Sequence, residues 1–126
     1  NDVIARARRL RKMLGGGMRQ AGIIAAAGRY ALDHNVERLA QDHRRTKQLA
    51  LALDGIEGLD FDMQRVQTNM LFLRSTHMPD LADHLAQCGI AITAIGQNAR
   101  LVLHMQIDDV ALQLIIESIQ AFFASR

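Results

Sequence analysis

The stretch that decides the fold is NMLFLR, residues 69–74. Four consecutive apolar residues between polar neighbours are typical of a short buried β-strand. Similar apolar runs occupy residues 90–95 and 101–105, so we expect three strands. A small sheet is stable only when other elements cover one of its faces, and helical patterns do flank these three runs.

Two of these helical patterns follow the first and the last strand. Pro79 begins a helix between the first two apolar runs, at a position where its missing N–H costs little. Asp108 and Asp109 begin a final helix whose apolar residues recur every three or four positions: Leu112, Ile115, Ile119, Phe122 and Phe123. The order strand, helix, strand, strand, helix predicts an α+β fold, in a small C-terminal domain over residues 56–126.

A long helical segment precedes this domain. Residues 2–14 carry apolar side chains at helical spacing between basic ones, and the three glycines at 15–17 should end that helix. Residues 20–32 are apolar on nearly all sides, which predicts a helix that is buried or lies at a subunit interface. Residues 36–53 fit a more polar helix. We expect residues 1–55 to link the small domain to a large domain that this chain lacks.

Length and composition favour one modest folded domain. The chain has 126 residues, of which 49% are hydrophobic and 22% charged, a composition that gives no reason to expect a disordered or fibrous protein. It begins with Asn1 rather than Met and without a signal peptide, which favours a piece of a longer protein. No apolar run is long enough to cross a bilayer. The single cysteine, Cys88, fits a reducing compartment such as the cytoplasm, and we expect it to be buried.

The charge is unevenly distributed along the chain. Residues 1–48 contain eleven Lys and Arg against four Asp and Glu, whereas residues 49–126 contain four against nine. Such asymmetry accompanies contact with nucleic acid, with a small anion or with another subunit. The chain has no Trp and few other aromatic residues, which leaves little for base stacking. A basic helix that faces solvent or a partner protein is therefore favoured over nucleic-acid binding.

Two basic positions are candidates for anion binding. Arg19 follows the glycine-rich turn, where a flexible backbone and a helix start attract anions, although neither the P-loop nor the dinucleotide pattern is present. A plain turn between helices fits this segment equally well. Arg100 stands beside an apolar strand, where its planar fork would bind a carboxylate through two parallel hydrogen bonds. The carboxylate could belong to a ligand or to an internal acid.

The histidines form no recognisable metal or catalytic motif. His77 and His84 lie near Asp80 and Asp83, but their spacing matches no zinc or metalloprotease pattern. We interpret them as a solvated helix face and expect no metal. His104 falls within the third apolar run and is expected to be a packed or hydrogen-bonded core residue.

The segment RRLRKMLGGGMRQAG, residues 8–22, resembles the low-specificity L-threonine aldolases, which are pyridoxal 5'-phosphate enzymes of the aspartate aminotransferase fold. The resemblance continues through residues 25–32, 34–39, 42–43, 67–70 and 100–104, and so covers almost the whole chain. It implies the C-terminal part of such an enzyme, with the small α+β domain of fold-type I enzymes. The sequence departs from the family pattern at Leu10, where Trp is common, and at Leu103, where Thr is common.

This resemblance implies a lyase that cleaves L-threonine, L-allo-threonine and related β-hydroxy-α-amino acids to glycine and an aldehyde, with pyridoxal phosphate as electron sink. Arg100 matches the family arginine that binds the substrate α-carboxylate. Arg19 and Lys12 match basic positions that approach the active site, where they would bind the cofactor. The family's cofactor-linked lysine precedes the matched block, and neither Lys12 nor Lys47 has its context. The chain alone is therefore predicted to be inactive and to contain no catalytic residue.

The same resemblance implies a cytoplasmic homotetramer that acts in threonine catabolism and glycine biosynthesis. Its partners would be an amino-acid substrate and the missing large domain or a companion chain, with no nucleic acid or membrane. The alternative is a non-catalytic module that uses Arg19 and Arg100 to bind a small anion, or that mediates oligomerisation.

Overall fold

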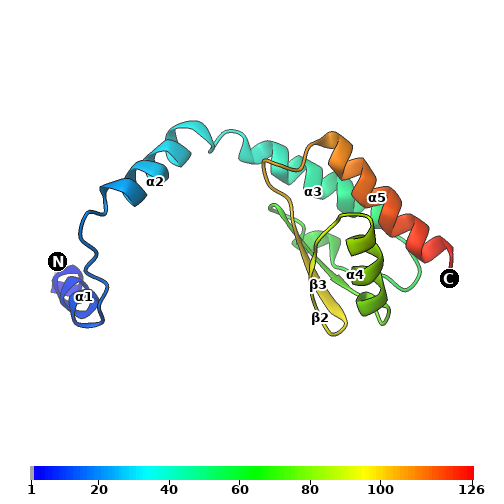
Figure 1. Cartoon of the computed structure of the whole chain (residues 1–126), viewed down its shortest axis with the longest axis horizontal. Coiled ribbons are helices and arrows are strands. Elements are labelled where there is room, and N and C mark those ends of the chain that lie inside the picture. Colours follow the sequence, from blue (N-terminus) through cyan, green and yellow to red (C-terminus); the bar gives the residue numbers. More distant parts are fainter. Residues whose placement is uncertain (1) are drawn as a thin grey trace. The chain divides into compact units, whose positions relative to one another are not determined.

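The computed structural model describes residues 2–126, which form two compact units. The first unit ends at Glu37, and the second comprises Arg38–Arg126. Figure 1 shows the order of their helices and strands along the chain. The sequence-based boundary at residue 55 falls just after the helix Leu39–Leu53 ends, whereas the second unit begins at Arg38, immediately before that helix starts.

The first unit contains two helices, α1 (Asp2–Met13) and α2 (Gly22–His34). The predicted glycine stop is confirmed. Gly15 adopts a left-handed φ of +80°, its N–H donates to Lys12 O, and the N–H of Gly16 donates to Arg11 O at 2.8 Å. These two bonds satisfy carbonyls that the helix end would otherwise leave unpaired. α2 begins two residues later than the apolar pattern suggested.

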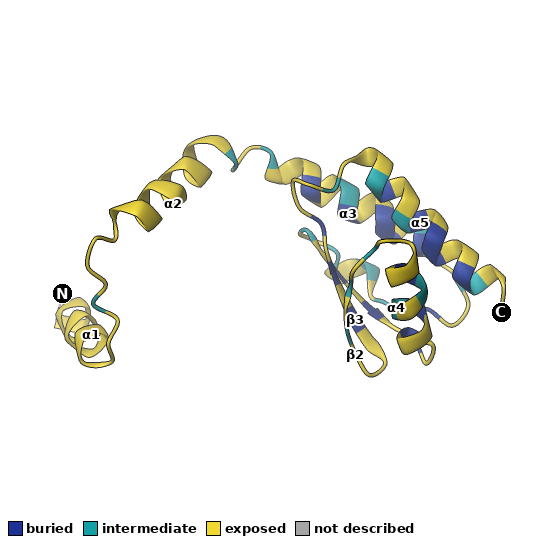
Figure 2. Cartoon of the chain, viewed as in Figure 1, coloured by how far each residue is buried: buried dark blue, intermediate teal, exposed yellow. Residues whose placement is uncertain are grey.

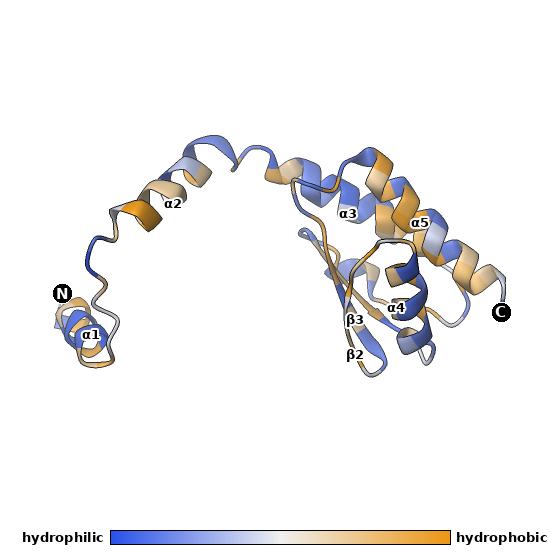
Figure 3. Cartoon of the chain, in the orientation of Figure 1, coloured by the Kyte–Doolittle hydropathy of each residue, from blue (hydrophilic) through white to orange (hydrophobic). Residues whose placement is uncertain are grey.

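The side chains of this unit are largely open to solvent. Neither α1 nor α2 contains a buried residue, and Ile23 and Leu32 of α2 are 82% and 72% exposed. Figure 3 shows the hydrophobic start of α2, and Figure 2 shows that the helix is exposed. Burial of residues 20–32, one of the two alternatives predicted, does not occur within the unit. The other alternative, a subunit interface, stays a prediction.

The second unit has the predicted α+β class and the predicted order of elements. Asp108 caps the last helix, because its carboxylate accepts from the backbone N–H of Ala111 at 2.8 Å. Pro79 lies in the first turn of the helix that follows the first strand. The elements of the unit are α3 (Leu39–Leu53), the short 3-10 helix η1 (Met63–Arg65), β1 (Met70–Arg74), α4 (Met78–Gln87), β2 (Thr93–Ile95), β3 (Asn98–Val102) and α5 (Asp109–Ala124).

The three strands form one antiparallel sheet in the order β1-β3-β2. β2 and β3 are joined by a two-residue turn in which Gly96 has a φ of +57°. Because this turn is so short, β3 already begins at Asn98. It ends at Val102, whereas the apolar run had suggested a strand over residues 101–105. Arg100 therefore lies in the middle of the central strand and not beside it, as the apolar run 101–105 had suggested.

Helices cover one face of this sheet. Along β1 and β3 buried and exposed residues alternate, and the buried ones pack with α3, α4 and α5 (Figure 2). α3 belongs to this packing and so to the second unit. The other face of the sheet, called the open face here, carries the exposed residues of the three strands. The largest fully buried side chains of the core are Leu49, Leu53, Leu71, Met78, Leu81, Leu85 and Ile119.

Within the described residues, no helix combines the length and the hydropathy needed to cross a membrane.

Candidate functional site

Arg100 occupies the centre of the open face. Its register neighbours are Phe72 on β1 and Thr93 on β2. The N–H of Leu103 donates to Asn69 O at 2.9 Å, and that of Ser75 donates to Gln97 O at 2.9 Å. Leu103 with Asn69, and Ser75 with Gln97, are thus hydrogen-bonded residue pairs. Along an antiparallel ladder such pairs alternate with non-hydrogen-bonded pairs. Phe72 and Arg100 are therefore a non-hydrogen-bonded pair, the kind whose side chains stand closer together.

The guanidinium of Arg100 is available to a ligand. The residue is exposed, and within residues 2–126 its side chain makes no hydrogen bond or ion pair. No internal acid therefore binds Arg100 in the described part of the chain. A cation held on a central strand, with strands on both sides, is well placed to bind a carboxylate through two charge-assisted hydrogen bonds.

Asn69 closes the β1–β3 ladder beside this site. Its side-chain amide Nδ2 donates to Leu103 O at 2.8 Å, while its own carbonyl accepts from the N–H of Leu103. Together these bonds fix the register in which Arg100 faces Phe72. The sequence pattern did not reveal this role, although residues 67–70 belong to the resembled stretch.

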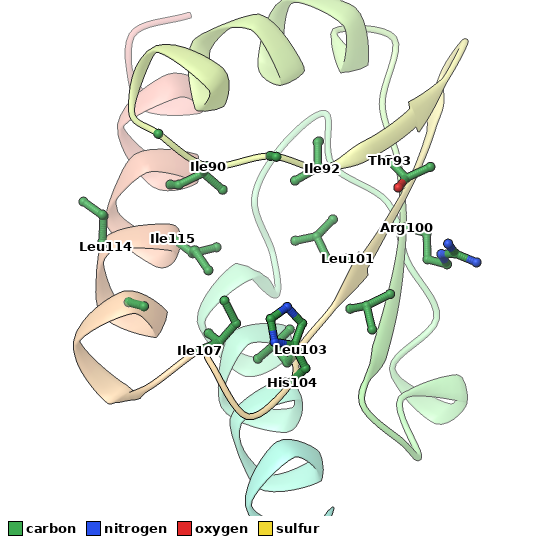
Figure 4. Close-up of a pocket in the computed structure, with 14 residues that line it drawn as sticks. Ile90, Ile92, Thr93, Arg100, Leu101, Leu103, His104, Ile107, Leu114 and Ile115 are labelled. Carbon is green, nitrogen blue, oxygen red and sulfur yellow. The ribbon is translucent and has the colours of Figure 1, made fainter. Parts of the chain in front are cut away.

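A cavity of about 340 Å³ opens on the other side of β3, between the strand and α5. Figure 4 shows apolar side chains, among them Ile90, Leu101 and Ile115, gathered around it. Arg100 is also one of the residues that line the cavity, but its guanidinium points away from these apolar side chains (Figure 4). Leu103, one of the two departures from the resembled pattern, is buried in the cavity wall. The carboxylate site that Arg100 offers is therefore on the open face rather than in this cavity.

Lys12 and Arg19 belong to the first unit, whereas Arg100 belongs to the second. The side chain of Lys12 lies against Gly17: a Cβ added there would be 3.1 Å from Lys12 Cδ and 3.5 Å from Lys12 Nζ. A larger residue at position 17 would push the ammonium aside. In the described chain neither Lys12 nor Arg19 forms an ion pair. Two unpaired cations that flank a glycine turn suit an anionic group such as a phosphate.

The residues considered for a metal cluster have structural contacts. Arg126 donates through Nη1 to His77 Nδ1 at 3.0 Å and through Nη2 to Asp80 at 2.8 Å. The ring of His84 donates through Nε2 to Ser118 O at 3.2 Å. These bonds fasten α5 to α4. Among residues 2–126 no group of three or more potential metal ligands is present.

Two predictions about single residues were wrong. His104 is not a core residue of a strand: it lies beyond the end of β3, is exposed, and accepts at Nδ1 from the N–H of Gln106. Cys88 is exposed rather than buried, because it is the C-cap of α4 and faces away from the core. Apolar neighbours in the sequence suggested burial in both cases. His104 lies after the last paired residue of β3, and Cys88 lies directly after the last residue of α4.

An ion pair joins α3 to the start of α5. Arg45 Nε donates to Asp109 Oδ1 at 2.7 Å, with Arg44 3.9 Å from the same oxygen. The hydrogen bond from Arg45 lowers the pKa of Asp109 below its usual value of 3.8, and the same bond raises the pKa of Arg45. This pair positions the two helices and lies outside the candidate site.

Comparison with known families defines the class of this chain. The model of the beta-eliminating lyase family matches residues 1–76. The chain therefore belongs to the beta-eliminating lyase family. Among its relatives are the probable low-specificity L-threonine aldolase 2 of Arabidopsis thaliana, 35% identical over 128 residues, and the low specificity L-threonine aldolase of Escherichia coli (strain K12), 39% identical over 125 residues.

The alignments cover nearly the whole of this chain but only part of each relative. They include 97% of the chain and 36% of the Arabidopsis protein, and 98% of the chain and 36% of the Escherichia coli protein. The chain thus spans about a third of the length of these relatives.

Proposed function

We propose that this chain is part of a pyridoxal-phosphate-dependent aldolase that cleaves L-threonine, L-allo-threonine and related β-hydroxy-α-amino acids to glycine and an aldehyde. The observation that carries the proposal is Arg100, which has no acid partner among residues 2–126 and lies on the open face of the sheet at the position that resembles the family's substrate arginine. The names of the relatives support the same reaction. The cofactor-linked lysine would lie outside residues 1–126, so the chain alone would be inactive.

In this proposal Arg100 binds the substrate α-carboxylate. Its two parallel hydrogen bonds fix both oxygens and so the plane of the carboxylate. With the amino group held as a second anchor, the orientation of the bonds at Cα is fixed as well. The backbone of Arg100 is held by β1 on one side and β2 on the other. Such fixation supports the reaction because the Cα–Cβ bond must keep one orientation while it breaks.

The cofactor contacts would come from the first unit. Pyridoxal phosphate, when bound, supplies an electron sink for the charge that develops at Cα. Lys12 and Arg19 would hold its phosphate, and the arrangement of Lys12 over Gly17 is consistent with such an anion site. The helices of residues 1–55 would link the small domain to the large domain, within a cytoplasmic homotetramer that serves threonine catabolism and glycine biosynthesis.

Replacement of Arg100 tests the substrate contact in the complete enzyme. We expect Arg100→Ala to raise KM for L-threonine about 10- to 100-fold, because a hydrogen bond to a charged group contributes roughly 1.5–3 kcal/mol. Arg100→Lys should recover only part of this loss, since an ammonium cannot form the two parallel bonds. Steady-state kinetics, with the cofactor absorbance recorded for each variant, measures both effects.

Arg44→Ala is the matched control for this experiment. Arg44 is an exposed arginine of the same unit, 58% accessible, whose nearest carboxylate oxygen is 3.9 Å away. We expect its KM to stay within about twofold of the wild type, as is usual for a surface change. A KM for Arg100→Ala that equals the value for Arg44→Ala would contradict the assignment.

A second candidate function is the non-catalytic module that binds a small anion or mediates oligomerisation. The observation that favours it is α2, whose apolar side chains have no cover within their unit. Exposed apolar surface of this kind is typical of contact with another protein surface. Binding of carboxylates without any cleavage by the complete protein would favour this second candidate.

A further inference from the structure

Phe72 is an aromatic residue on the open face, next to the proposed carboxylate site. It is 55% exposed at the middle of β1, although its strand neighbours Leu71 and Leu73 are buried. It faces Arg100 across a non-hydrogen-bonded pair, so the ring and the guanidinium start from closely spaced backbone positions. In the next pair on the same face, Met70 and Val102 are also partly exposed. The cation is therefore bordered by an apolar surface.

The space beside Phe72 is hollow. A depression of about 370 Å³ lies between β1, β3 and the segment that leads into η1. Phe72 forms part of its wall together with one aromatic and four charged residues: Phe61, Asp60, Asp62, Arg65 and Arg74. Asn98, the next open-face residue along β3 from Arg100, also lines it, and same-face residues along a strand are roughly 7 Å apart. The depression therefore begins within about that distance of Arg100. A side chain attached to a carboxylate at Arg100 can reach it while resting on the ring of Phe72.

We propose that Phe72 determines substrate specificity: its ring is the wall against which the β-substituent of an amino acid held by Arg100 packs. This inference rests on the proposed function. The class of substrate it favours is β-hydroxy-α-amino acids with an aromatic β-substituent, because two aromatic rings pack with more buried area than a ring and a methyl group. Phe72 contacts the part of the substrate that leaves as the aldehyde, whereas Arg100 holds the part that leaves as glycine.

The test compares two substrates in the complete enzyme, 3-phenylserine and L-threonine. We expect Phe72→Ala to lower the ratio of their kcat/KM values, phenylserine over threonine, by about tenfold or more, within the range for lost apolar contact in a substrate pocket. Phe72→Leu keeps an apolar side chain and should lower the ratio less. Because Phe72 is outside the core, both variants should fold, and far-ultraviolet circular dichroism checks this.

Ile95→Ala is the matched control. Ile95 is 79% exposed on the same open face, but it lies on β2 opposite Asn98 rather than opposite Arg100. We expect this variant to change the ratio less than about twofold. An unchanged ratio in both Phe72 variants, or an equal decrease in Ile95→Ala, would overturn the inference.

A second readout does not depend on the reaction. Calorimetry on the complete protein, with and without cofactor, gives Kd for 3-phenylpropanoate and for propanoate. We expect 3-phenylpropanoate to bind more tightly, with Phe72→Ala removing most of the difference and Arg100→Ala weakening both acids. Phe72-dependent binding without aldol cleavage would support the specificity site and contradict the proposed reaction. If the complete enzyme cleaves its substrates while neither the Kd values of the two acids nor the kcat/KM ratio depends on Phe72, the reaction is supported and the specificity site is overturned.

Discussion

Arg100 shows how a backbone can be fixed while its side chain remains available. Its backbone lies in the central strand, between the strands that carry Phe72 and Thr93, while its guanidinium has no acid partner within residues 2–126. When a ligand binds, ordering is therefore needed only in the side chain and not in the backbone. Asn69 contributes to this rigidity through its two bonds to Leu103.

Replacement of Asn69 should loosen the end of this ladder. We expect Asn69→Ala to lower the free energy of unfolding by about 1 kcal/mol, because the partly buried bond to Leu103 O is lost. Urea denaturation measures the effect. Asn98→Ala, an exposed asparagine on the same ladder, is the control and should change stability by less than about 0.5 kcal/mol. Equal losses in the two variants would contradict a specific role for Asn69.

The ion pair of Asp109 and Arg45 predicts a dependence of stability on pH. Arg45 lowers the pKa of Asp109 below 3.8 in the folded chain. The pair therefore stabilises the fold above the unfolded pKa, and the contribution is lost as the pH falls through the folded pKa. We expect Asp109→Asn to lower Tm at neutral pH. The difference in Tm between the variant and the wild type should become smaller as the pH falls below about 4. Calorimetric scans across this range measure the change.

The Arg45→Gln background supplies the control for this pH effect. Asp109→Asn should then have little pH-dependent effect on Tm, because the hydrogen bond that lowers the carboxyl pKa is already absent. An unaltered pH dependence in that background would show that another group is responsible.

At single residues, the sequence predicted the chemistry of a side chain better than its surroundings. A lone arginine beside an apolar strand indicated a carboxylate partner, either a ligand or an internal acid; residues 2–126 provide no internal acid for Arg100, and the ligand stays a prediction. The pairing of Arg100 with Phe72 was not predictable, because it depends on the register of two strands 28 positions apart in the chain. His104 and Cys88 were wrong because the ends of their elements, not their neighbours in sequence, decide their exposure.

Among the elements, periodicity identified the type and the order, while hydrogen bonds set the ends. The periodic face of α5 was visible in the sequence. The continuous apolar run of β1 predicted a buried strand, whereas β1 alternates buried and exposed residues because helices cover only one face of the sheet. The bounds of β2 and β3 were not visible in the sequence, because the short turn at Gly96 decides where pairing starts. The apolar run of residues 90–95 starts before β2, because the residues around Ile90 line the cavity beside α5 and do not pair in the sheet.

The N-cap of α5 offers a direct test at the scale of one element. We expect Asp108→Ala to destabilise the second unit by about 1 kcal/mol, because the N–H of Ala111 loses its acceptor. Asp108→Asn keeps a side-chain oxygen and should cost much less. Thermal unfolding of the two variants distinguishes a capping role from a charge effect, since equal losses would indicate that the charge alone matters.

In the molecule as a whole, packing is concentrated in the second unit. Within residues 2–126, all sixteen buried hydrophobic residues lie between Leu49 and Phe122, whereas neither helix of the first unit buries a residue. We therefore expect residues 38–126 to fold without the first 37. A cooperative thermal transition for that fragment would support this expectation, and a transition without cooperativity would contradict it.

The exposed apolar side chains of α2 predict self-association of the whole chain. Sedimentation velocity should show concentration-dependent oligomers for residues 1–126 and a monomer for residues 38–126. A replacement of Ile23 and Leu32 by Ser in the whole chain should reduce the association, because these side chains are 82% and 72% exposed. A stable dilute monomer of residues 1–126 would contradict the role of α2 as a contact surface.

The measurement that bears most directly on the function is a crystal structure of the complete enzyme with glycine bound. We predict that both carboxylate oxygens of glycine lie about 2.7–2.9 Å from the guanidinium nitrogens of Arg100, on the open face of the sheet and beside Phe72. A glycine carboxylate held by another cation, with Arg100 directed to solvent or to an internal acid, would contradict the proposed role.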